Sequence, residues 1–343
     1  MRIFNFFTQD IAIDLGTANT LIIQDGKIVV DEPSIIAINR RTGETIAVGT
    51  KAMQMHEKTH ENIKTIRPLK DGVIADFQAA ESMIEGLINM AVKRKKFFTH
   101  LKMVICIPSG ITEVEKRAVF DSADHVDSKE TYLIHEPMAA ALGIGLDVEE
   151  PIGNMIIDIG GGTTEIAVIA LSGIVCDQSI RTAGDEFTAD IMNFMKRQHN
   201  ILIGERTAEQ IKIHVGSALS ELENPPEEFA VNGRDLMTGI PKQITIGYAE
   251  IAHALDKSIS KIEDAILKAL ETTPPELASD IYKTGLYLTG GGALLRGLDK
   301  RIAQKTKLPV HIAEDPLRAV VRGTGIALQN SHKFTFLIDR KSV

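Results

Sequence analysis

The chain has 343 residues, 38 Lys and Arg, 46 Asp and Glu, and a formal net charge of −8 at pH 7. The length predicts about two domains, and the 44% hydrophobic and 24% charged residues are ordinary values for a soluble globular protein. The acidic balance excludes a protein that binds nucleic acid over its whole surface, and we expect no nucleic-acid partner. No apolar run reaches the length of a membrane-spanning helix.

The first part of the chain predicts a run of short strands and then alternating helices and strands. Turn pairs such as Asp25-Gly26 separate the first strands. Apolar residues at three- and four-residue spacing predict a helix at about 77–95, and Thr112-x-x-Glu115 is a capping-box pattern that opens another helix. The expected strands are residues 9–15, 20–24, 27–30, 34–39 and 103–107.

The second half repeats this layout. Its expected strands are residues 154–159, 165–171, 173–180 and 286–288. Its expected helices are residues 186–199, 207–223, 250–271 and 294–305. The pair Pro274-Pro275 closes the longest of these helices. The mixture of hairpins with strand–helix–strand units predicts an α/β fold with some antiparallel strand pairing.

Two segments of the chain resemble one another. Residues 11–17, IAIDLGT, and residues 156–163, IIDIGGGT, each place an Asp at the end of an apolar strand and then Gly and Thr in a turn. A further expected strand follows each turn. Two such units predict a duplicated fold with a cleft between its halves.

The first of these turns, residues 14–20, has the features of a phosphate-binding hairpin. Its backbone N–H groups and the side chains of Thr17 and Asn19 would form a concave row of donors that suits phosphate oxygens. Asp14 at the strand end suits a hydrated Mg²⁺, which prefers carboxylate, water and phosphate oxygens. The alternative is a plain hairpin with an Asp in its turn.

Three consecutive glycines, Gly160 to Gly162, make the second turn more distinctive. Such a run costs chain entropy and permits backbone that other residues do not adopt, so it indicates close approach to a ligand, with a flexible turn as the alternative. A third glycine run, within residues 288–293, lies between a strand and a helix, where backbone N–H groups bind anions. The chain contains neither a GxxxxGK[ST] P-loop nor a GxGxxG Rossmann motif.

The segment 133–143, LIHEPMAAALG, carries a carboxylate at an expected helix start. Pro137 suits the first position of a helix, which places Glu136 immediately before it. The Glu136 carboxylate would complement the helix dipole, or it would orient a water for attack on a phosphate while the two Asp residues hold a metal. His135 is expected to be a local hydrogen-bonding residue rather than a catalyst.

Five segments in this order resemble the actin/Hsp70/sugar-kinase ATPase superfamily and, within it, the MreB family of bacterial actins. They are IDLGTANT, EPMAAALG, DIGGGTTEIAVI, IGERTAEQIK and TGGGALLRGL, and the resemblance covers residues from about 8 to 329. It implies an actin-like fold of duplicated ribonuclease-H-like domains around a nucleotide cleft. Domain I would comprise residues 1–146 with 316–343, and domain II residues 147–315. Their small subdomains would lie at about 32–75 and 205–255.

The resemblance also implies roles for individual residues, with ATP and Mg²⁺ as cofactors. Asp14 and Asp158 match residues that position Mg²⁺ through water. Glu136 matches the residue that orients the attacking water and Thr163 its helper, so the expected catalytic residues are Glu136, Asp158 and Thr163. The residues by themselves do not decide between adenine and guanine.

The nucleotide contacts implied by the resemblance come from four segments. Glu209 and Lys212, one helical turn apart, match contacts to ribose and adenine, and Gly290 to Ala293 match an adenosine loop. The full expected set is Thr17, Ala18, Asn19, Gly160, Gly161, Gly162, Thr163, Glu209, Gln210, Ile211, Lys212, Gly290, Gly291, Gly292 and Ala293.

By the same resemblance the protein would be a filament-forming ATPase that transfers the terminal phosphoryl group of ATP slowly to water. Its expected partners are copies of itself in paired protofilaments, and membrane proteins of cell shape and wall synthesis. A small-molecule kinase of the same superfamily is the alternative, but it would need an acceptor site and usually a longer chain. A chaperone of the Hsp70 class would need a further substrate domain, for which 343 residues leave no room.

Two aromatic segments predict contact with the inner face of the cytoplasmic membrane. One pair of rings follows the four cations of residues 93–96, and the other rings lie beside Arg2. Rings at the headgroup boundary next to cations suit an anionic lipid surface. The alternatives are packing on the next strand with a solvated helix end, and a simple extension of the first strand. The residues concerned are Phe97, Phe98, Phe4, Phe6 and Phe7.

Two features say less about function. Cys106 and Cys176 lie in apolar strand-like runs with neither a CxxC partner nor a nearby His set, so we expect two buried thiols in a reducing cytoplasm. The tail, residues 331–343, lies beyond the resemblance and has alternating apolar residues. It is an added strand, a partner tag or disorder.

Overall fold

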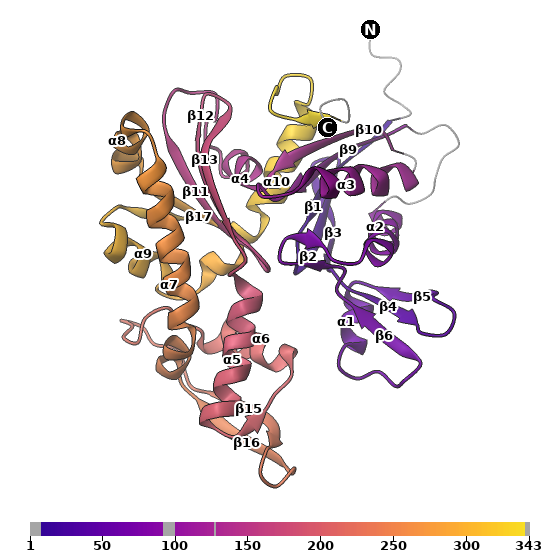
Figure 1. The fold of residues 1–343 in the computed structure, drawn as a ribbon, viewed down its shortest axis with the longest axis vertical. Coiled ribbons are helices and arrows are strands. Elements are labelled where there is room, and N and C mark those ends of the chain that lie inside the picture. The colour runs from indigo at the N-terminus through magenta and orange to yellow at the C-terminus, as the bar shows by residue number, and fades with distance from the viewer. Residues whose placement is uncertain (1–7, 92–99, 127, 340–343) are drawn as a thin grey trace.

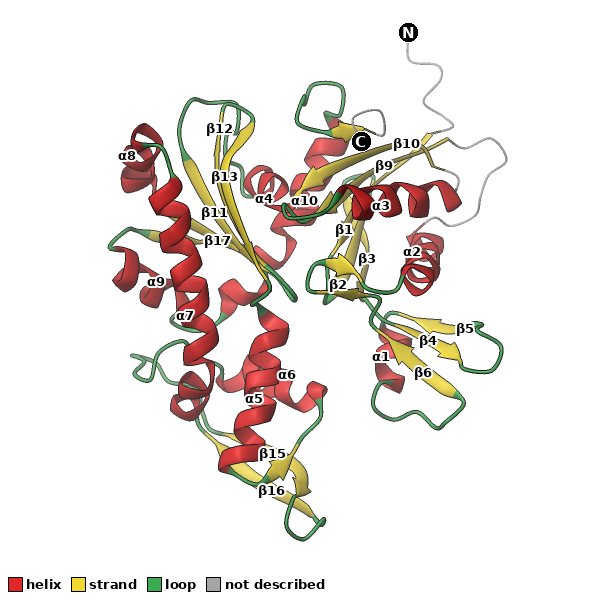
Figure 2. Ribbon diagram, viewed as in Figure 1, coloured by secondary structure: helices red, strands yellow, loops and turns green. Residues whose placement is uncertain are grey.

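The structure is a computed structural model that describes residues 8–91, 100–126 and 128–339. It contains two large sheets with helices on both faces of each, and two smaller arms below them (Figure 1). The helices α4 (Glu136–Gly143) and α10 (Ala319–Gln329) lie between the two large sheets (Figure 2). The mixed α/β architecture and the duplication expected from the sequence are therefore both present.

The first large sheet has the strand order β19-β10-β9-β1-β2-β3. Strands β1, β2 and β3 form an antiparallel meander, whereas β1, β9 and β10 are parallel. Alternate residues of β1 enter different cores: Ile11 and Ile13 pack with α2 and α3, and Ala12 packs with α4 and α10. The bounds are β1 (Thr8–Leu15), β2 (Asn19–Gln24), β3 (Lys27–Pro33), β9 (His100–Ile107), β10 (Ser128–His135), β19 (Ile338–Asp339), α2 (Phe77–Ala91) and α3 (Glu113–His125).

The second large sheet has the order β13-β12-β11-β17-β18 and repeats this pattern. Strands β11, β12 and β13 are an antiparallel meander, and β17 pairs parallel with β11 as β9 does with β1. Every residue of β11 and β12 is buried, because helices cover both faces. The bounds are β11 (Asn154–Ile159), β12 (Thr164–Ala170), β13 (Gly173–Ile180), β17 (Leu286–Thr289) and β18 (Val310–Ile312).

The pair of helices between the sheets is packed at the limit that backbone atoms allow. A Cβ on Gly143 would lie 1.8 Å from the carbonyl oxygen of Ala319, and a Cβ on Gly323 would lie 1.7 Å from that of Ala139. Glycine is required at both positions because any larger residue would separate the helices. Side chains from both sheets, including Val104 and Ile156, complete this shared core.

Each large sheet carries a smaller arm, and the two arms project on either side of a gap (Figure 1). One arm contains the sheet β5-β4-β6 with the short helix α1, and the other contains the sheet β14-β15-β16 with α5 and α6. The short hairpin β7–β8 turns back toward the large sheets. The bounds are β4 (Ile36–Asn39), β5 (Thr45–Val48), α1 (Thr50–Met55), β6 (Ile63–Ile66), β7 (Leu69–Lys70), β8 (Val73–Ile74), α5 (Gly184–Gln198), β14 (Ile201–Leu202), α6 (Glu205–Val215), β15 (Phe229–Asp235) and β16 (Pro241–Ile246).

Several predicted elements have different ends in the structure. The helix expected at 207–223 ends at Val215, because Gly216 adopts extended backbone and a Cβ there would meet the carbonyl of Lys212. The helix expected at 294–305 is a short 3₁₀ turn and then α9, since Leu295 is extended. The remaining elements are α7 (Tyr248–Thr272), α8 (Pro275–Thr284), η1 (Gly291–Leu294), α9 (Leu298–Thr306) and η2 (Pro316–Arg318).

Three other expectations can be compared with the structure. The capping box is confirmed, since Thr112 Oγ1 accepts from the Glu115 N–H group and Glu115 accepts from that of Thr112. Cys106 is buried in β9, but the prediction of a second buried thiol was wrong because Cys176 in β13 is only partly buried. The tail supplies β19, which pairs antiparallel with β10. Among the described residues, no helix is long and apolar enough to cross a membrane.

Candidate functional site

The two glycine turns predicted from the sequence face each other across the floor of the gap between the arms. A Cβ on Gly161 would lie 2.8 Å from Ala18 Cβ, and a Cβ on Gly162 would lie 2.8 Å from Thr17 Oγ1. Neither glycine has a positive φ, so their requirement is one of space rather than of backbone conformation. The structure thus brings the first turn, from β1–β2, into contact with the second, from β11–β12.

In the second turn, the carbonyl oxygens of Gly160 and Gly161 are hydrogen-bonded, whereas two of its N–H groups are not bonded to any described residue. The first residues of α5 donate to it: Gly184 N–H to the Gly160 oxygen at 3.1 Å, and Asp185 N–H to the Gly161 oxygen at 2.8 Å. The N–H groups of Gly161 and Gly162 have no hydrogen-bond partner among the residues that the structure describes. Such a group of unpaired donors suits the oxygens of a phosphate.

A third turn, which the sequence did not predict, reaches the same place. The β7–β8 turn holds Asp71 and Gly72 with φ of 53° and 76°, as a tight hairpin turn requires. Its Gly72 N–H group donates to Thr17 Oγ1 at 3.2 Å, and a Cβ on Gly72 would lie 2.7 Å from Thr163 Cγ2. The Asp71-Gly72 pair was the available signal, and only the fold shows where it lies.

Four carboxyl groups gather beneath these turns. Burial, together with the charge of Asp158, raises the pKa of Asp14 to about 7. Burial raises the pKa of Glu136 well above its usual range, and the charges of Glu165, Asp158 and Asp14 add to the effect. Glu165, which the sequence analysis missed, follows Thr164 in β12 and is 1% exposed. Asp158 is buried as well, and Asp14 and Glu136 are partly exposed as whole residues; carboxyl groups placed together in this way suit a cation.

Asp158 and Glu165 are held by hydrogen bonds. Thr289 Oγ1 donates to Asp158 Oδ1 at 2.7 Å, which moderates the effect of burial, and burial still raises the pKa of Asp158 to about 6. Ser179 Oγ donates to Glu165 Oε1 at 2.6 Å and the Ser109 N–H group donates to Oε2 at 3.2 Å. Ser109 follows β9, so the Ser109 bond joins the two halves.

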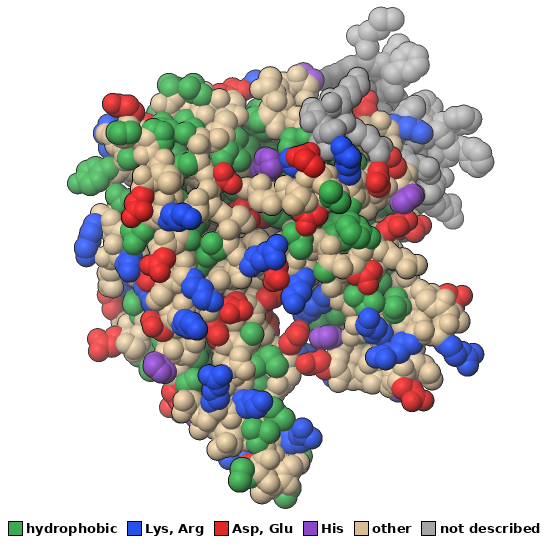
Figure 3. Space-filling model, viewed as in Figure 1, with side chains coloured by type: hydrophobic (Ala, Val, Ile, Leu, Met, Phe, Trp, Pro, Cys, Tyr) green, Lys and Arg blue, Asp and Glu red, His purple; other side chains and the backbone are tan. Residues whose placement is uncertain are grey.

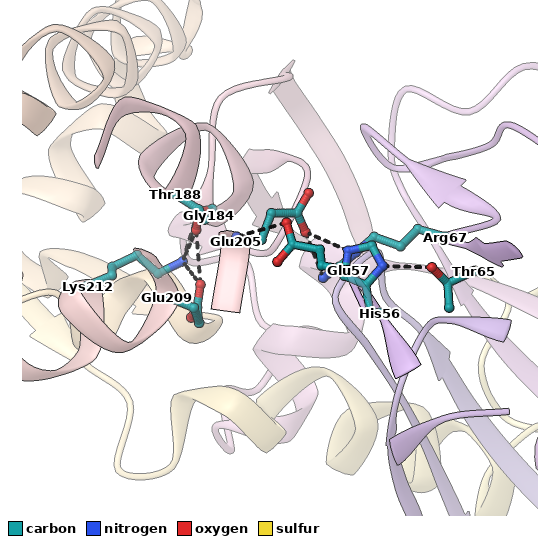
Figure 4. Close-up of polar contacts among 9 residues, drawn as sticks. All are labelled: His56, Glu57, Thr65, Arg67, Gly184, Thr188, Glu205, Glu209 and Lys212. Carbon is teal, nitrogen blue, oxygen red and sulfur yellow. Dashed lines mark hydrogen bonds and ion pairs between the residues drawn. The ribbon is translucent and has the colours of Figure 1, made fainter. Parts of the chain in front are cut away.

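The residues expected to contact ribose and adenine, 209–212, lie on α6, and two of them contact α5 (Figure 4). Lys212 Nζ donates to the Gly184 oxygen at 2.9 Å and pairs with Glu209 Oε2 at 2.7 Å. Thr188 Oγ1 lies 3.0 Å from the same Glu209 oxygen. Of the other two expected residues on α6, Gln210 is exposed, whereas Ile211 is buried in the core and offers no side chain to a ligand.

The third glycine run packs directly on the second turn. Gly290 has a φ of 78°, and a Cβ on it would lie 2.3 Å from the Ile159 oxygen and 2.9 Å from Asp158 Oδ1. Its N–H group donates to the Pro316 oxygen at 3.0 Å. The run therefore lies beside the carboxyl cluster, and it leads into a 3₁₀ turn rather than the expected α-helix.

Two sets of predictions remain to be placed. His135 Nδ1 lies 3.4 Å from the Pro108 oxygen, which agrees with a local hydrogen-bonding role. The membrane residues Phe97, Phe98, Phe4, Phe6 and Phe7 lie outside the described residues. Figure 3 shows charged side chains of both signs along the gap between the arms.

Comparison with known proteins identifies the family. A family model described as MreB/Mbl protein matches residues 8–335. Cell shape-determining protein Mbl from Bacillus subtilis is 47% identical over 95% of this chain and 98% of its own length. Cell shape-determining protein MreB from Escherichia coli K12 is 48% identical over 94% of each chain.

Solved structures agree. The crystal structure of MreB5 of Spiroplasma citri bound to AMPPNP has a TM-score of 0.90 and 39% identity, covering 95% of this chain and 97% of that one. The MamK double helical filament has a TM-score of 0.79 at 21% identity, which supports the fold alone. The expected actin-like fold is confirmed, and the chain belongs to the MreB/Mbl family of actin-like, cell shape-determining proteins.

Proposed function

We propose that the gap between the arms binds ATP with Mg²⁺ and that the chain hydrolyses the ATP. The observation that carries the proposal is the placement of two facing glycine turns beside a group of buried and partly buried carboxyl side chains. The MreB5 structures bound to AMPPNP and to ADP, at 39% identity, support it. A small-molecule kinase is not favoured, because the family that matches nearly the whole chain is MreB/Mbl.

Different segments of the site would bind the phosphates, the ribose with the adenine, and the outer side of the adenosine. The turns of residues 17–19 and 160–163 would hold the phosphates through their N–H groups. Glu209 and Lys212 would bind ribose and adenine, with Gln210 at the rim, and residues 290–293 would cover the adenosine. Ile211 would support this surface from the core only.

Asp14 and Asp158 would hold Mg²⁺ through water. Contacts through water suit Mg²⁺, which gives up its own waters reluctantly and usually keeps several of them. When bound, Mg²⁺ supplies positive charge that offsets the charge of the transferred phosphoryl group. The same charge would lower the raised pKa values of both aspartates, so they would release protons as the metal binds.

Glu136 is the proposed catalytic residue for water. It is the first residue of α4 and lies near Asp14, Asp158 and Glu165, and its carboxyl group would accept a hydrogen bond from the attacking water. Thr163 would supply a second contact to that water, and the Gly72 turn beside its methyl group limits its movement. Positioning of this kind supplies most of the rate in phosphoryl transfer to water.

The test is phosphate release by the Glu136→Ala variant. Nucleotide affinity should stay within about twofold, while phosphate release should fall by about 100-fold or more. Glu113→Ala, an exposed glutamate near the start of α3, is the matched control and should behave as wild type. Unchanged phosphate release in Glu136→Ala would remove Glu136 from the mechanism.

ATP binding would favour filaments, in which the chain is its own partner in paired protofilaments. We take residues 1–146 with 316–343 and residues 147–315 as the two moving bodies, which the chain joins at residues 146–147 and 315–316 and which share the core around α4 and α10. Closure around a nucleotide is a common switching mode, and it would change the surfaces that meet in a filament. Sedimentation with ATP at micromolar concentration tests this, and a protein that stays in the supernatant would contradict it.

The proposed cellular role is at the inner face of the cytoplasmic membrane, with membrane proteins of cell shape and wall synthesis as partners. Phe97, Phe98, Phe4, Phe6 and Phe7 would insert at the headgroup boundary, beside cations that attract anionic lipid. Replacement of Phe97 and Phe98 by Ser should weaken cosedimentation with anionic liposomes. Unaffected binding would favour packing of these rings within the fold.

A further inference from the structure

The two arms touch at one group of side chains on the open side of the site (Figure 4). Glu205, the first residue of α6, extends from one arm. It meets Arg67, which directly follows β6, and the pair His56 and Glu57, which directly follow α1, on the other arm. We call these four residues the cross-cleft contact. It lies apart from every residue assigned above to phosphate, metal or water.

The geometry of this contact is specific. Arg67 Nη2 and Glu205 Oε2 are 3.3 Å apart, and His56 Nε2 is 3.4 Å from the same oxygen. In the reverse direction, the backbone N–H group of Glu205 donates to Glu57 Oε1 at 3.3 Å. Each arm therefore contributes both a donor and an acceptor, and the N-terminus of α6 faces a carboxylate, as its dipole favours.

The receiving arm is organised to hold these side chains in place. His56 Nδ1 lies 2.9 Å from Thr65 Oγ1, which fixes the ring from the neighbouring strand. Glu57 has a φ of 59°, an uncommon conformation for a residue with a side chain. Such backbone persists where surrounding contacts maintain it, and here it directs a carboxylate toward the opposite arm.

The same helix connects the cross-cleft contact to the nucleotide site. One turn beyond Glu205, α6 carries Glu209 and then Lys212, and Lys212 Nζ donates to the Gly184 oxygen. Gly184 in turn donates its N–H to Gly160 of the second phosphate turn. A displacement of α6 would therefore alter both the nucleoside surface and the support of that turn.

We propose that Glu205 and Arg67 are positioning residues for the nucleotide: their pairing across the gap holds α6 against the opposite arm and so sets how long ATP stays bound. The proposal rests on ATP binding in this cleft. It assigns the pair no contact with the nucleotide itself.

The expected effect is moderate because the pair is partly exposed. The side chains of Glu205 and Arg67 are 44% and 28% exposed, and exposed ion pairs are weak. A weak contact suits a closure that has to reopen in each cycle. We expect its loss to speed nucleotide release by about fivefold, the lower end of coupling between sites.

The experiment compares single charge reversals with their combination. Arg67→Glu and Glu205→Arg each place like charges opposite one another and should raise the dissociation rate of a fluorescent ATP analogue by about fivefold. The double variant restores opposite charges and should recover most of the wild-type rate. Arg206→Glu is the control, because it makes the same charge change as Arg67→Glu. Arg206 follows Glu205 in α6, is exposed, and has no ion pair with a described residue.

Two further readouts separate positioning from general damage. The KM for ATP should rise in each single variant while kcat at saturating ATP stays within about twofold, and the double variant should return KM toward wild type. Spin labels at Glu61→Cys and Thr238→Cys, in a Cys176→Ser background, report the distance between the arms. With bound nucleotide, the distribution of these distances should be broader in the single variants than in wild type.

The outcomes are distinct. Equal release rates in wild type and both single variants, or no recovery in the double variant, would overturn the proposal. If wild-type protein fails to bind the analogue at all, the ATP-binding function itself is wrong. If Arg206→Glu matches Arg67→Glu, the effect comes from the change in net charge rather than from the pair, and the cross-cleft contact is again overturned.

Discussion

The two strand–turn–strand units of the cleft differ in the residue that lies beside each aspartate. Asp14 pairs in register with Cys106 of the parallel strand β9, and Asp158 pairs at the same place with Thr289 of β17. Thr289 donates a hydrogen bond to Asp158, whereas a cysteine S–H group is a weak donor. Burial and the charge of Asp158 raise the pKa of Asp14 to about 7, whereas burial, moderated by the Thr289 hydrogen bond, raises that of Asp158 to about 6.

The two aspartates therefore have different pKa values although the turns that carry them repeat. The Thr289 hydroxyl moderates the effect of burial on the pKa of Asp158 only. The charge of Asp158 then raises the pKa of Asp14, so the two groups titrate as a coupled pair. Burial raises the pKa of both aspartates, so a bound cation would favour the charged form of each.

The largest expected effect is on the stability of the nucleotide-free protein. A carboxyl group with a raised pKa in the folded state binds its proton more tightly when folded, so it lowers the free energy of unfolding as pH rises. For Asp14 the loss should develop between about pH 4 and pH 7, and for Asp158 between about pH 4 and pH 6.

Asp14→Asn should therefore stabilise the protein at pH 8 more than at pH 4, by on the order of a few kcal/mol, and Asp158→Asn should do so less. Urea unfolding at both pH values, without nucleotide or metal, measures this. The rate of phosphate release should fall by about 10- to 100-fold in both variants despite the gain in stability. Equal gains in the free energy of unfolding for the two variants would contradict the difference between the two aspartates.

The second expected effect concerns contact between the turns. Gly161→Ala places a methyl group against Ala18, so it should push the two turns apart and weaken ATP binding by about tenfold. Gly247→Ala is the matched control, because a Cβ there has open space and neither glycine has a positive φ. Isothermal titration with ATP and Mg²⁺ measures the difference, and wild-type affinity in Gly161→Ala would show that the turns tolerate separation.

The smallest expected effect comes from exchanging the residues that lie beside the two aspartates. Thr289→Val removes the donor to Asp158 and should raise its pKa toward that of Asp14. Cys106→Thr places a hydroxyl at the equivalent register position and should lower the pKa of Asp14 by about one unit. Carboxyl ¹³C titration by NMR, with aspartate labelling, reads both values. If neither moves, the difference arises from burial alone.

Much of the fold could be predicted from the sequence, because local patterns decide it. Apolar spacing located α7 to within two residues at its start and one at its end, and the Thr112 capping box marked the start of α3. The prediction failed where long-range contacts act. The helix at 207–223 stops at Val215, and Ser217 beyond it bridges to Arg296, while Ile211 is buried in the core.

By itself, the sequence determined the repeated Asp-Gly-Thr turns, the glycine runs and the acidic residue that opens α4, since chain-local residue types produce each of them. Only the tertiary structure decided that Glu165 joins the carboxyl group, that the Asp71-Gly72 turn lies between the phosphate turns, and that Glu205 meets Arg67. These contacts join residues far apart in the chain. Burial and proximity, which set every pKa in the cleft, exist only after folding has brought those residues together.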